Sequence, residues 1–210
     1  MRALIIANGE IKDVAIIEQT IREGDCVICL DGGLRYADKA GIMPSVIVGD
    51  FDSVDIELVE KYRAKGVEIH SFPVRKDFTD MEIGIDIAVE KGAAELVLMA
   101  ALGGRMDHAL GNVFNMQRAL SKGVSVRIID EAQHMFLINN NKKFNYKKGT
   151  VISLIPITEQ VKGVKTDNLS YPLNYETLYN GDSRGLSNVF DEDEAQICMS
   201  QGILLVIINV

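Results

Sequence analysis

The sequence predicts two structural regions: an N-terminal parallel, Rossmann-like α/β/α domain over residues 1–130, and an all-β, sandwich-like domain over residues 131–210. Two observations lead to this prediction. Up to about Ile129, short runs rich in Val and Ile alternate with mixed segments long enough for crossover helices, which is typical of a parallel sheet covered on both faces. After Asp130, short strand-like runs follow one another with turn residues between them, as in an antiparallel sandwich or barrel.

The α/β prediction depends on six apolar runs and the five segments between them. The expected strands are Ala3–Ala7, Cys26–Leu30, Ser45–Val48, Val67–Ser71, Leu96–Ala100 and Val124–Ile129. The expected helices are Asp13–Arg22, Leu34–Lys39, Asp55–Lys65, Asp80–Lys91 and Asp107–Ser121. The segment Met81–Val89 also alternates with a period of two residues. A helix is predicted there because parallel strands need a crossover connection and Thr79 or Asp80 is a suitable N-cap.

The C-terminal region contains seven short strand candidates separated by turn-like residues such as Asn139–Asn141 and Lys148-Gly149. They are Phe136–Ile138, Lys143–Tyr146, Thr150–Pro156, Gln160–Val164, Asn188–Phe190, Ala195–Met199 and Ile203–Ile208. Strands this short and this closely spaced favour antiparallel pairing.

Composition and charge exclude some classes of function. The chain has 210 residues, 47% of them hydrophobic, and a net charge of -8, which argues against general binding to nucleic acid or anionic membrane. Its apolar stretches are too short to span a bilayer. The first residues are typical of a strand and turn rather than of a signal peptide, so the cytoplasm is the expected location.

The cysteines are expected to be buried thiols. Cys26 and Cys29 match C-x-x-C, but within a strand their side chains point to opposite faces, which favours buried thiols over redox or zinc chemistry.

Five predicted strand-to-helix loops are rich in Gly, Asp and basic residues, whereas the opposite loops are plain turns. Ligands of parallel sheets bind at the carboxyl ends of the strands, so one site is expected at this edge. The loops are Asn8-Gly9-Glu10, Asp31-Gly32-Gly33-Leu34-Arg35, Gly49-Asp50-Phe51-Asp52-Ser53, Arg75-Lys76-Asp77-Phe78-Thr79-Asp80 and Gly103-Gly104-Arg105-Met106-Asp107-His108.

The acidic residues of these loops indicate Mg²⁺-dependent phosphoryl chemistry. Asp50 and Asp52 repel each other across one residue. With Asp80 or Asp77 they form a set of hard oxygen ligands, which Mg²⁺ shares with substrate phosphates. The alternative is that Asp50 and Asp52 cap the turn and the following helix.

The glycine and basic residues suit a polyphosphate. Gly-Gly pairs at 32–33 and 103–104 allow amides near helix N-termini to contact phosphate oxygens, although such pairs also form plain turns. No Walker A motif is present. His108 is either a helix-cap residue or a nucleotide contact. Positive charge for the phosphates would come from Arg35, Arg75, Lys76 and Arg105, unless Arg75 and Lys76 are simply solvated.

Taken in order along nearly the whole chain, these motifs resemble those of the thiamine pyrophosphokinase family. The residues that carry the resemblance are Asp31-Gly32-Gly33, Gly49-Asp50-Phe51-Asp52-Ser53, Lys76-Asp77-x-Thr79-Asp80, Gly103-Gly104-Arg105-x-Asp107-His108 and Ser183-Arg184-Gly185-Leu186-Ser187-Asn188. The resemblance implies transfer of a pyrophosphoryl group from ATP to the hydroxyl of thiamine with Mg²⁺, giving thiamine diphosphate and AMP. It also implies a catalytic α/β domain that binds ATP and Mg²⁺, a β-sandwich that binds thiamine and dimerises, and a homodimer with sites at the subunit interface.

The resemblance also assigns roles to individual residues. The catalytic residues would be Arg105 and the three Mg²⁺ ligands Asp50, Asp52 and Asp80. Contacts with ATP are expected from Asn8, Asp31, Gly32, Gly33, Arg35, Gly103, Gly104, Arg105, Asp107, His108 and Asn112. Contacts with the second substrate, thiamine, are expected from Asp77, Thr79, Asp80, Tyr171, Ser187 and Asn188.

Tyr171 departs from the family pattern, because some members have Trp there and this chain contains no Trp. A tyrosine ring can still stack on a thiazolium cation. The alternatives are an ordinary strand aromatic for Tyr171 and an ordinary turn for Ser187-Asn188.

Two other functions are compatible with the acidic loop. A phosphohydrolase or a nucleotide-sugar transferase also uses an Asp-x-Asp pair, but haloacid-dehalogenase-type enzymes carry theirs after the first strand, and here the pair follows the third. A non-catalytic nucleotide or thiamine sensor is the other alternative, although sensing does not require three metal carboxylates.

Overall fold

The structure is a computed structural model that describes residues 1–52, 54–72 and 77–210. The chain divides into two compact units, Met1–Glu131 and Ala132–Val210, one residue beyond the expected boundary. Three residues named from the sequence, Ser53, Arg75 and Lys76, lie outside the described residues.

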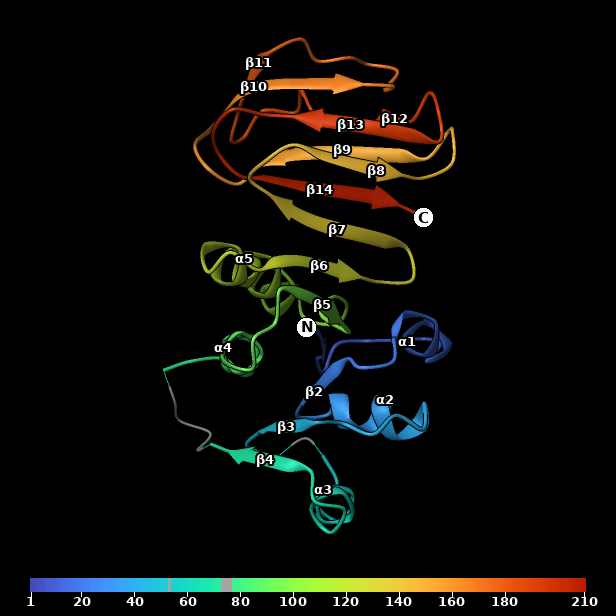
Figure 1. Ribbon diagram of the computed structural model, residues 1–210, viewed down its shortest axis with the longest axis vertical. Helices are drawn as coiled ribbons and strands as arrows, with labels where there is room; N and C mark the ends of the chain where they lie inside the picture. The colour runs from blue at the N-terminus through green and yellow to red at the C-terminus, as the bar shows by residue number, and fades with distance from the viewer. Residues whose placement is uncertain (53, 73–76) are drawn as a thin grey trace. The chain divides into compact units, whose positions relative to one another are not determined.

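In the first unit, described strands form a parallel sheet in the order β6-β5-β1-β2-β3-β4. In Figure 1, α4 and α5 lie on one side of this sheet and α1, α2 and α3 on the other. The strand order reverses between β1 and β5, the kind of position where open α/β sheets bind ligands. The strands are β1 (Arg2–Ile6), β2 (Cys26–Leu30), β3 (Val46–Gly49), β4 (Glu68–Ser71), β5 (Glu95–Met99) and β6 (Ser125–Ile129). The helices are α1 (Ala15–Thr20), α2 (Gly33–Lys39), α3 (Ile56–Arg63), α4 (Asp80–Glu90) and α5 (Met106–Ser121).

The central strands are apolar at nearly every position because both of their faces are covered. Cys26–Leu30 is buried throughout, as is Val46–Gly49. On one face, the α1 side chain Ile17 and the α2 side chain Leu34 join the strand residues in a single core cluster. The expected six strands and five helices of this region are confirmed, and each end agrees to within two residues.

The ambiguous segment is a helix, α4, as predicted. Thr79 is its N-cap, and its side chain and that of Glu82 form a capping box: Glu82 N donates to Thr79 Oγ1 (3.3 Å) and Thr79 N donates to Glu82 Oε2 (2.8 Å). The buried residues Met81, Ile85 and Ala88 recur at helical spacing. The period-two alternation in the sequence therefore has no structural counterpart.

The second unit is a sandwich of two antiparallel sheets, with the strand orders β12-β9-β14-β7 and β11-β10-β13-β8. Phe136, Leu154 and Phe190 pack with Val161 and Ile197 of the other sheet in one core. The strands are β7 (Gln133–Ile138), β8 (Lys142–Asn145), β9 (Val151–Pro156), β10 (Gln160–Asp167), β11 (Glu176–Tyr179), β12 (Asn188–Val189), β13 (Glu194–Cys198) and β14 (Leu204–Asn209).

Strand β11 was not predicted from the sequence. Glu176–Tyr179 is a four-residue edge strand with one fully buried residue, Leu178, so it is too short to show a clear alternation. The seven strands expected in this region are all present.

Two further expectations concern membranes and cysteines. No helix in the described parts of the chain is both long and apolar enough to cross a membrane. Cys26 and Cys29 are buried in β2 and neither forms a disulfide. Burial raises the pKa of the Cys29 thiol, so it stays protonated and acts as a core residue.

Candidate active site

The first unit contains a cavity of about 670 Å³, which is lined by residues from each of the five loops singled out in the sequence. Its walls include Asn8, after β1, and Gly103, after β5, so the cavity lies at the point where the strand order reverses. The prediction that these loops meet at one edge of the sheet is therefore confirmed. Predicted site residues that line the cavity are Asn8, Asp31, Asp50, Thr79, Asp80, Gly103, Gly104, Arg105, Asp107, His108 and Asn112.

The backbone around the cavity is closely packed and partly strained. A Cβ on Gly33 would lie 2.2 Å from the carbonyl oxygen of Ile6, and one on Gly49 would lie 1.8 Å from Asp31 Oδ1. Position 33 therefore requires glycine, because its neighbour is backbone, whereas a larger residue at position 49 would displace the Asp31 carboxylate. Asp31 and Phe51 adopt φ values of 42° and 62°, a region that costs energy for non-glycine residues and is found preferentially at functional sites.

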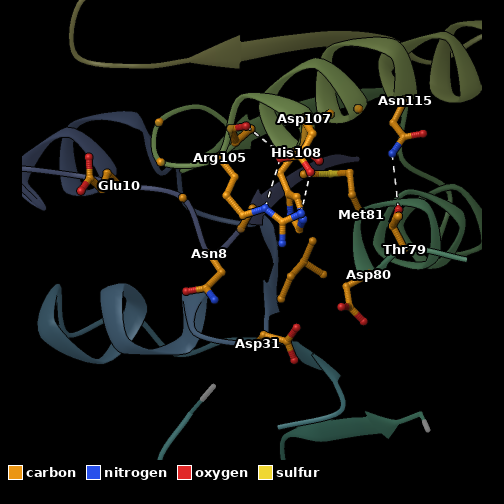
Figure 2. A pocket seen from close by; sticks show the side chains of 18 of the residues that line it. Asn8, Glu10, Asp31, Thr79, Asp80, Met81, Arg105, Asp107, His108 and Asn115 are labelled. Carbon is orange, nitrogen blue, oxygen red and sulfur yellow. Dashed lines mark hydrogen bonds and ion pairs between the residues drawn. The ribbon is translucent and has the colours of Figure 1, made fainter. Parts of the chain in front are cut away.

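Carboxyl groups crowd one wall of the cavity, where Asp31 and Asp80 lie side by side (Figure 2). Asp31 Oδ1 accepts hydrogen bonds from the backbone N–H groups of Asp50 (3.2 Å) and Phe51 (3.5 Å). Burial, a hydrogen bond with Asp80 and repulsion by Asp80 and Asp50 raise the pKa of Asp31 to about 7, despite the favourable Phe51 N–H. This wall therefore holds more negative charge than it can neutralise without a proton or a cation.

The other two acidic candidates, Asp52 and Asp77, lie outside the cavity lining. Asp50 Oδ1 accepts a hydrogen bond from the backbone N–H of Asp52 (3.0 Å). Repulsion by the Asp50 carboxylate is the main cause that raises the pKa of Asp52, and a hydrogen bond between the two side chains adds to it. Asp52 and Asp77 are both exposed. Among the described residues, no three His, Cys, Asp or Glu side chains are arranged to hold a metal ion.

A paired arginine lies across the cavity from the carboxyl wall. Arg105 donates from Nε and Nη2 to Asp107 Oδ1 (3.1 Å) and Oδ2 (2.5 Å), as Figure 2 shows. This arginine holds the pKa of Asp107 down, at about 2. Both side chains are mostly exposed, at 70% and 64%, so solvent screens the pair and Arg105 can exchange its partner for a phosphate.

Three predicted residues, Gly32, Gly33 and Arg35, are not among those that line the cavity. Arg35 donates from Nη2 to Asn8 Oδ1 (2.9 Å) and from Nε to the carbonyl of Gly32 (3.1 Å). Gly32 is the N-cap of α2 and Gly33 is its first residue. Asn112 lines the cavity and donates from Nδ2 to the carbonyl of Ala101 (2.8 Å), which holds α5 against the preceding loop.

Some lining residues were not singled out from the sequence. Glu10 and Phe78 belong to the predicted loops, whereas Met81 and Asn115 lie on helices. Asn115 Nδ2 is 3.5 Å from Thr79 Oγ1 (Figure 2). Because Asn115 follows Asn112 at helical spacing on α5, extending the His108–Asn112 face by one turn would have identified it.

Three predicted thiamine contacts belong to the second unit. Tyr171 is 61% exposed, and its backbone N–H and carbonyl are both bonded to the Asn188 amide, through Oδ1 (2.9 Å) and Nδ2 (2.7 Å). Asn188 itself is buried. Ser187 has a φ of 55° and donates its backbone N–H to Ser153 Oγ (3.0 Å). The Asn188 side chain thus fixes the backbone from which the Tyr171 ring projects.

Comparison with known proteins identifies relatives over the whole chain. A model of the thiamin pyrophosphokinase catalytic domain matches residues 17–128, and one of the thiamin pyrophosphokinase vitamin B1 binding domain matches residues 133–204. The sequence is 27% identical to thiamine pyrophosphokinase of Bacillus subtilis (strain 168), over 97% of this chain and 96% of that protein.

Solved structures agree with the sequence matches. The crystal structure of thiamine pyrophosphokinase from Bacillus subtilis has a TM-score of 0.91 at 25% identity and covers 100% of this chain and 99% of its own. The enzyme from Geobacillus thermodenitrificans has a TM-score of 0.87 at 28% identity, over 100% of this chain and 98% of its own. With both domain models matched in order, the chain belongs to the thiamine pyrophosphokinase family.

Proposed function

We propose that this chain transfers the pyrophosphoryl group of ATP to the hydroxyl of thiamine, giving thiamine diphosphate and AMP. The observation that carries the proposal is the single cavity on which all five loops converge, in a chain that contains both domains of the family. The hydroxyl oxygen of thiamine forms a bond to the β-phosphorus of ATP, and the bond from that phosphorus to the oxygen shared with the α-phosphorus breaks. AMP leaves with that oxygen, and the hydroxyl proton is released to solvent. Positioning and charge stabilisation then supply most of the rate enhancement, without a covalent enzyme intermediate.

We propose Asp50, Asp52 and Asp80 as the Mg²⁺ ligands. The chemistry of these carboxylates suits the ion: burial and the charges of Asp80 and Asp50 raise the pKa of Asp31, and the charge of Asp50 raises the pKa of Asp52. A divalent cation with oxygen ligands relieves this repulsion. When bound, Mg²⁺ would neutralise charge on the phosphate oxygens. Asp80 is preferred over Asp77 because Asp80 lines the cavity beside Asp31. We expect the ligands to close around the ion together with the ATP phosphates.

The nucleotide is proposed to bind along Gly103, Gly104 and the start of α5. These glycines have φ values of 83° and 64° and line the cavity, where backbone amides near a helix N-terminus favour phosphate oxygens. Arg105 would exchange Asp107 for a phosphate oxygen. His108 and Asn112, further along the same helix, would then face the rest of the nucleotide.

For thiamine, we propose that the exposed Tyr171 ring stacks on the thiazolium cation. Asn188 contributes by holding the Tyr171 backbone, since both its amide oxygen and its amide nitrogen are used there. Ser187 offers a hydroxyl next to this point. On the α/β side, Asp77 and Thr79 are proposed to contact thiamine beside Asp80.

We also propose a homodimer in the cytoplasm. The dimer rests on the family resemblance, and light scattering coupled to gel filtration tests it by giving the mass in solution. The location rests on the need for ATP and on the buried, unpaired thiols of Cys26 and Cys29, which suit a reducing compartment.

Product analysis separates this proposal from its rivals. The protein is incubated with thiamine, ATP and Mg²⁺, and the products are resolved by chromatography. We expect AMP and thiamine diphosphate in equal amounts, and none of either when EDTA replaces Mg²⁺. Release of phosphate alone would indicate a phosphohydrolase, and binding without turnover would indicate a sensor; either result contradicts the proposal.

A further inference from the structure

Arg118, in the last turn of α5, contacts three points of the segment that carries Asp80. Its Nε and Nη2 donate to Asp86 Oδ1 (2.8 Å) and Oδ2 (2.5 Å). Its Nη1 lies 3.7 Å from Glu82 Oε1, and its Cζ lies 5.8 Å from the centroid of the Phe78 ring. Arg118 does not itself line the cavity. A single guanidinium therefore holds Phe78, just before α4, together with the first two turns of that helix.

Glu82 links Arg118 to the cavity. While Oε1 faces Arg118, Oε2 of the same carboxylate accepts hydrogen bonds from the backbone N–H (2.8 Å) and the Oγ1 hydroxyl (2.9 Å) of Thr79. Thr79 is the N-cap of α4 and Asp80 is its first residue. The capping box therefore holds the backbone on either side of Asp80, from which the Asp80 side chain projects.

A second α5 residue, Asn115, contacts the same capping box. Asn115, one turn before Arg118, lines the cavity and reaches Thr79 Oγ1 from Nδ2 at 3.5 Å (Figure 2). Two successive turns of α5 thus hold the start of α4. The same helix carries His108 and Asn112 of the proposed nucleotide site.

We propose that Arg118 is a positioning residue for metal binding: it holds Phe78 and Glu82 so that the Asp80 carboxylate faces Asp31 in the cavity. The inference rests on the proposed function, in which Asp80 is a Mg²⁺ ligand. Groups that orient a metal ligand without touching the metal affect its affinity strongly. Arginine suits this role because its planar fork binds one carboxylate in two places while its face covers a ring, which lysine cannot do.

Lys122 provides the matched control. It also lies at the C-terminal end of α5 and donates from Nζ to Asp86 Oδ1 (2.6 Å). It therefore joins α5 to α4 through the same carboxylate, one turn further from Thr79 than Arg118. Removing Lys122 weakens the contact between the helices and leaves the Arg118–Glu82 and Arg118–Phe78 contacts in place.

The experiment compares Arg118→Met, Arg118→Lys and Lys122→Met in the full-length protein with a fixed, saturating concentration of a non-hydrolysable ATP analogue and without thiamine, because the ligands are expected to close around the ion together with the ATP phosphates. Mn²⁺, as a paramagnetic substitute for Mg²⁺, is titrated and followed by electron paramagnetic resonance. Hydrogen exchange reports opening of residues 80–84. In Arg118→Met we expect a loss of Mn²⁺ affinity of about tenfold or more, as for other ligand-orienting residues, together with faster exchange at residues 80–84. Lys122→Met should keep both the Mn²⁺ affinity and the exchange rates at residues 80–84 within about twofold of wild type, because it removes one exposed ion pair with Asp86 and no contact with Glu82 or Phe78.

Equal losses of Mn²⁺ affinity in Arg118→Met and Lys122→Met would overturn the inference and leave Arg118 as a clamp between helices. If Arg118→Met does not fold, Arg118→Lys decides: we expect near-normal melting with weakened Mn²⁺ binding, and full affinity would overturn the inference. If the wild type binds no Mn²⁺, the proposed metal site fails instead. The exchange rates at residues 80–84 then still decide whether Arg118 positions this segment.

Discussion

At the residue scale, the main feature of the site is a group of carboxyl side chains that lie close enough to repel one another. Asp31 is the clearest case, because the neighbouring carboxyls of Asp80 and Asp50, with burial, raise its pKa to about 7. The residue types and their loops could be read from the sequence. Side-chain pairings over long separations could not, since nothing in the sequence links Arg35 to Asn8 or Asn188 to Tyr171.

Replacing Asp31 with Asn should stabilise the metal-free protein at pH 8. The folded-state pKa of Asp31, about 7, is above its ordinary value of 3.8, so the folded state binds the extra proton and loses stability as pH rises from about 4 through 7. Thermal melting should show Asp31→Asn a few degrees above wild type at pH 8 and close to it at pH 4, where little of this stability has yet been lost. Equal differences at the two pH values would show that repulsion is not the cause.

Replacing Asp52 with Asn should lower kcat by roughly 100-fold with little change in thiamine binding, since a charged group that acts on the phosphates is lost. Steady-state kinetics at saturating ATP measure both parameters. Asp55→Asn is the control three residues away, because Asp55 caps α3 through a hydrogen bond from Glu57 N and Asn is an equally good cap. A retained kcat in Asp52→Asn would remove Asp52 from the metal site.

Replacing Tyr171 with Ala should raise the KM for thiamine by roughly tenfold, the loss expected for one cation–aromatic contact. Tyr171→Phe should retain most of the affinity, and Tyr175→Ala, at an equally exposed tyrosine nearby, should leave the KM unchanged. An unchanged KM in Tyr171→Ala would place the aromatic contact elsewhere.

At the element scale, helices α4 and α5 determine how the site is assembled. The two helices could be predicted from the lengths of the segments between strands. Thr79 as the N-cap of α4 was one of two candidates, and the capping box decides between them. The contact between the helices depends on Asp86, Arg118 and Lys122, and these residues show no pattern in the sequence. Strand β11 was missed for a related reason, because an edge strand with one buried residue has no periodicity.

The α4–α5 contact should weaken in acid. Hydrogen bonds from Arg118 and then Lys122 lower the pKa of Asp86 to about 2, below its ordinary 3.8, so its stabilising effect is present above pH 4 and is lost as pH falls towards 2. By urea unfolding, Asp86→Asn should cost about 1–2 kcal/mol at pH 6, after allowance for solvent screening. The gap to wild type should narrow by pH 3; a constant gap would mean that Asp86 acts through packing.

At the scale of the whole molecule, the arrangement of the strands explains why so much of the site was predictable. In a parallel sheet the carboxyl ends of all strands meet at one edge, so loops far apart in sequence must converge once the strands are assigned. The sequence could not show which side chains line the cavity and which support it. Arg35, for example, does not line the cavity but donates to Asn8, which does; its predicted contact with ATP stays a prediction.

The central claim is that the phosphates of ATP are positioned for attack at the β-phosphorus, so that the pyrophosphoryl group moves as a unit. The direct measurement uses ATP labelled separately at the β- and γ-phosphates, with thiamine and Mg²⁺, and follows each label into product. We predict that both labels appear in thiamine diphosphate in equal amounts and that the AMP carries neither. Transfer of the γ-label alone, with ADP as the second product, would contradict the account.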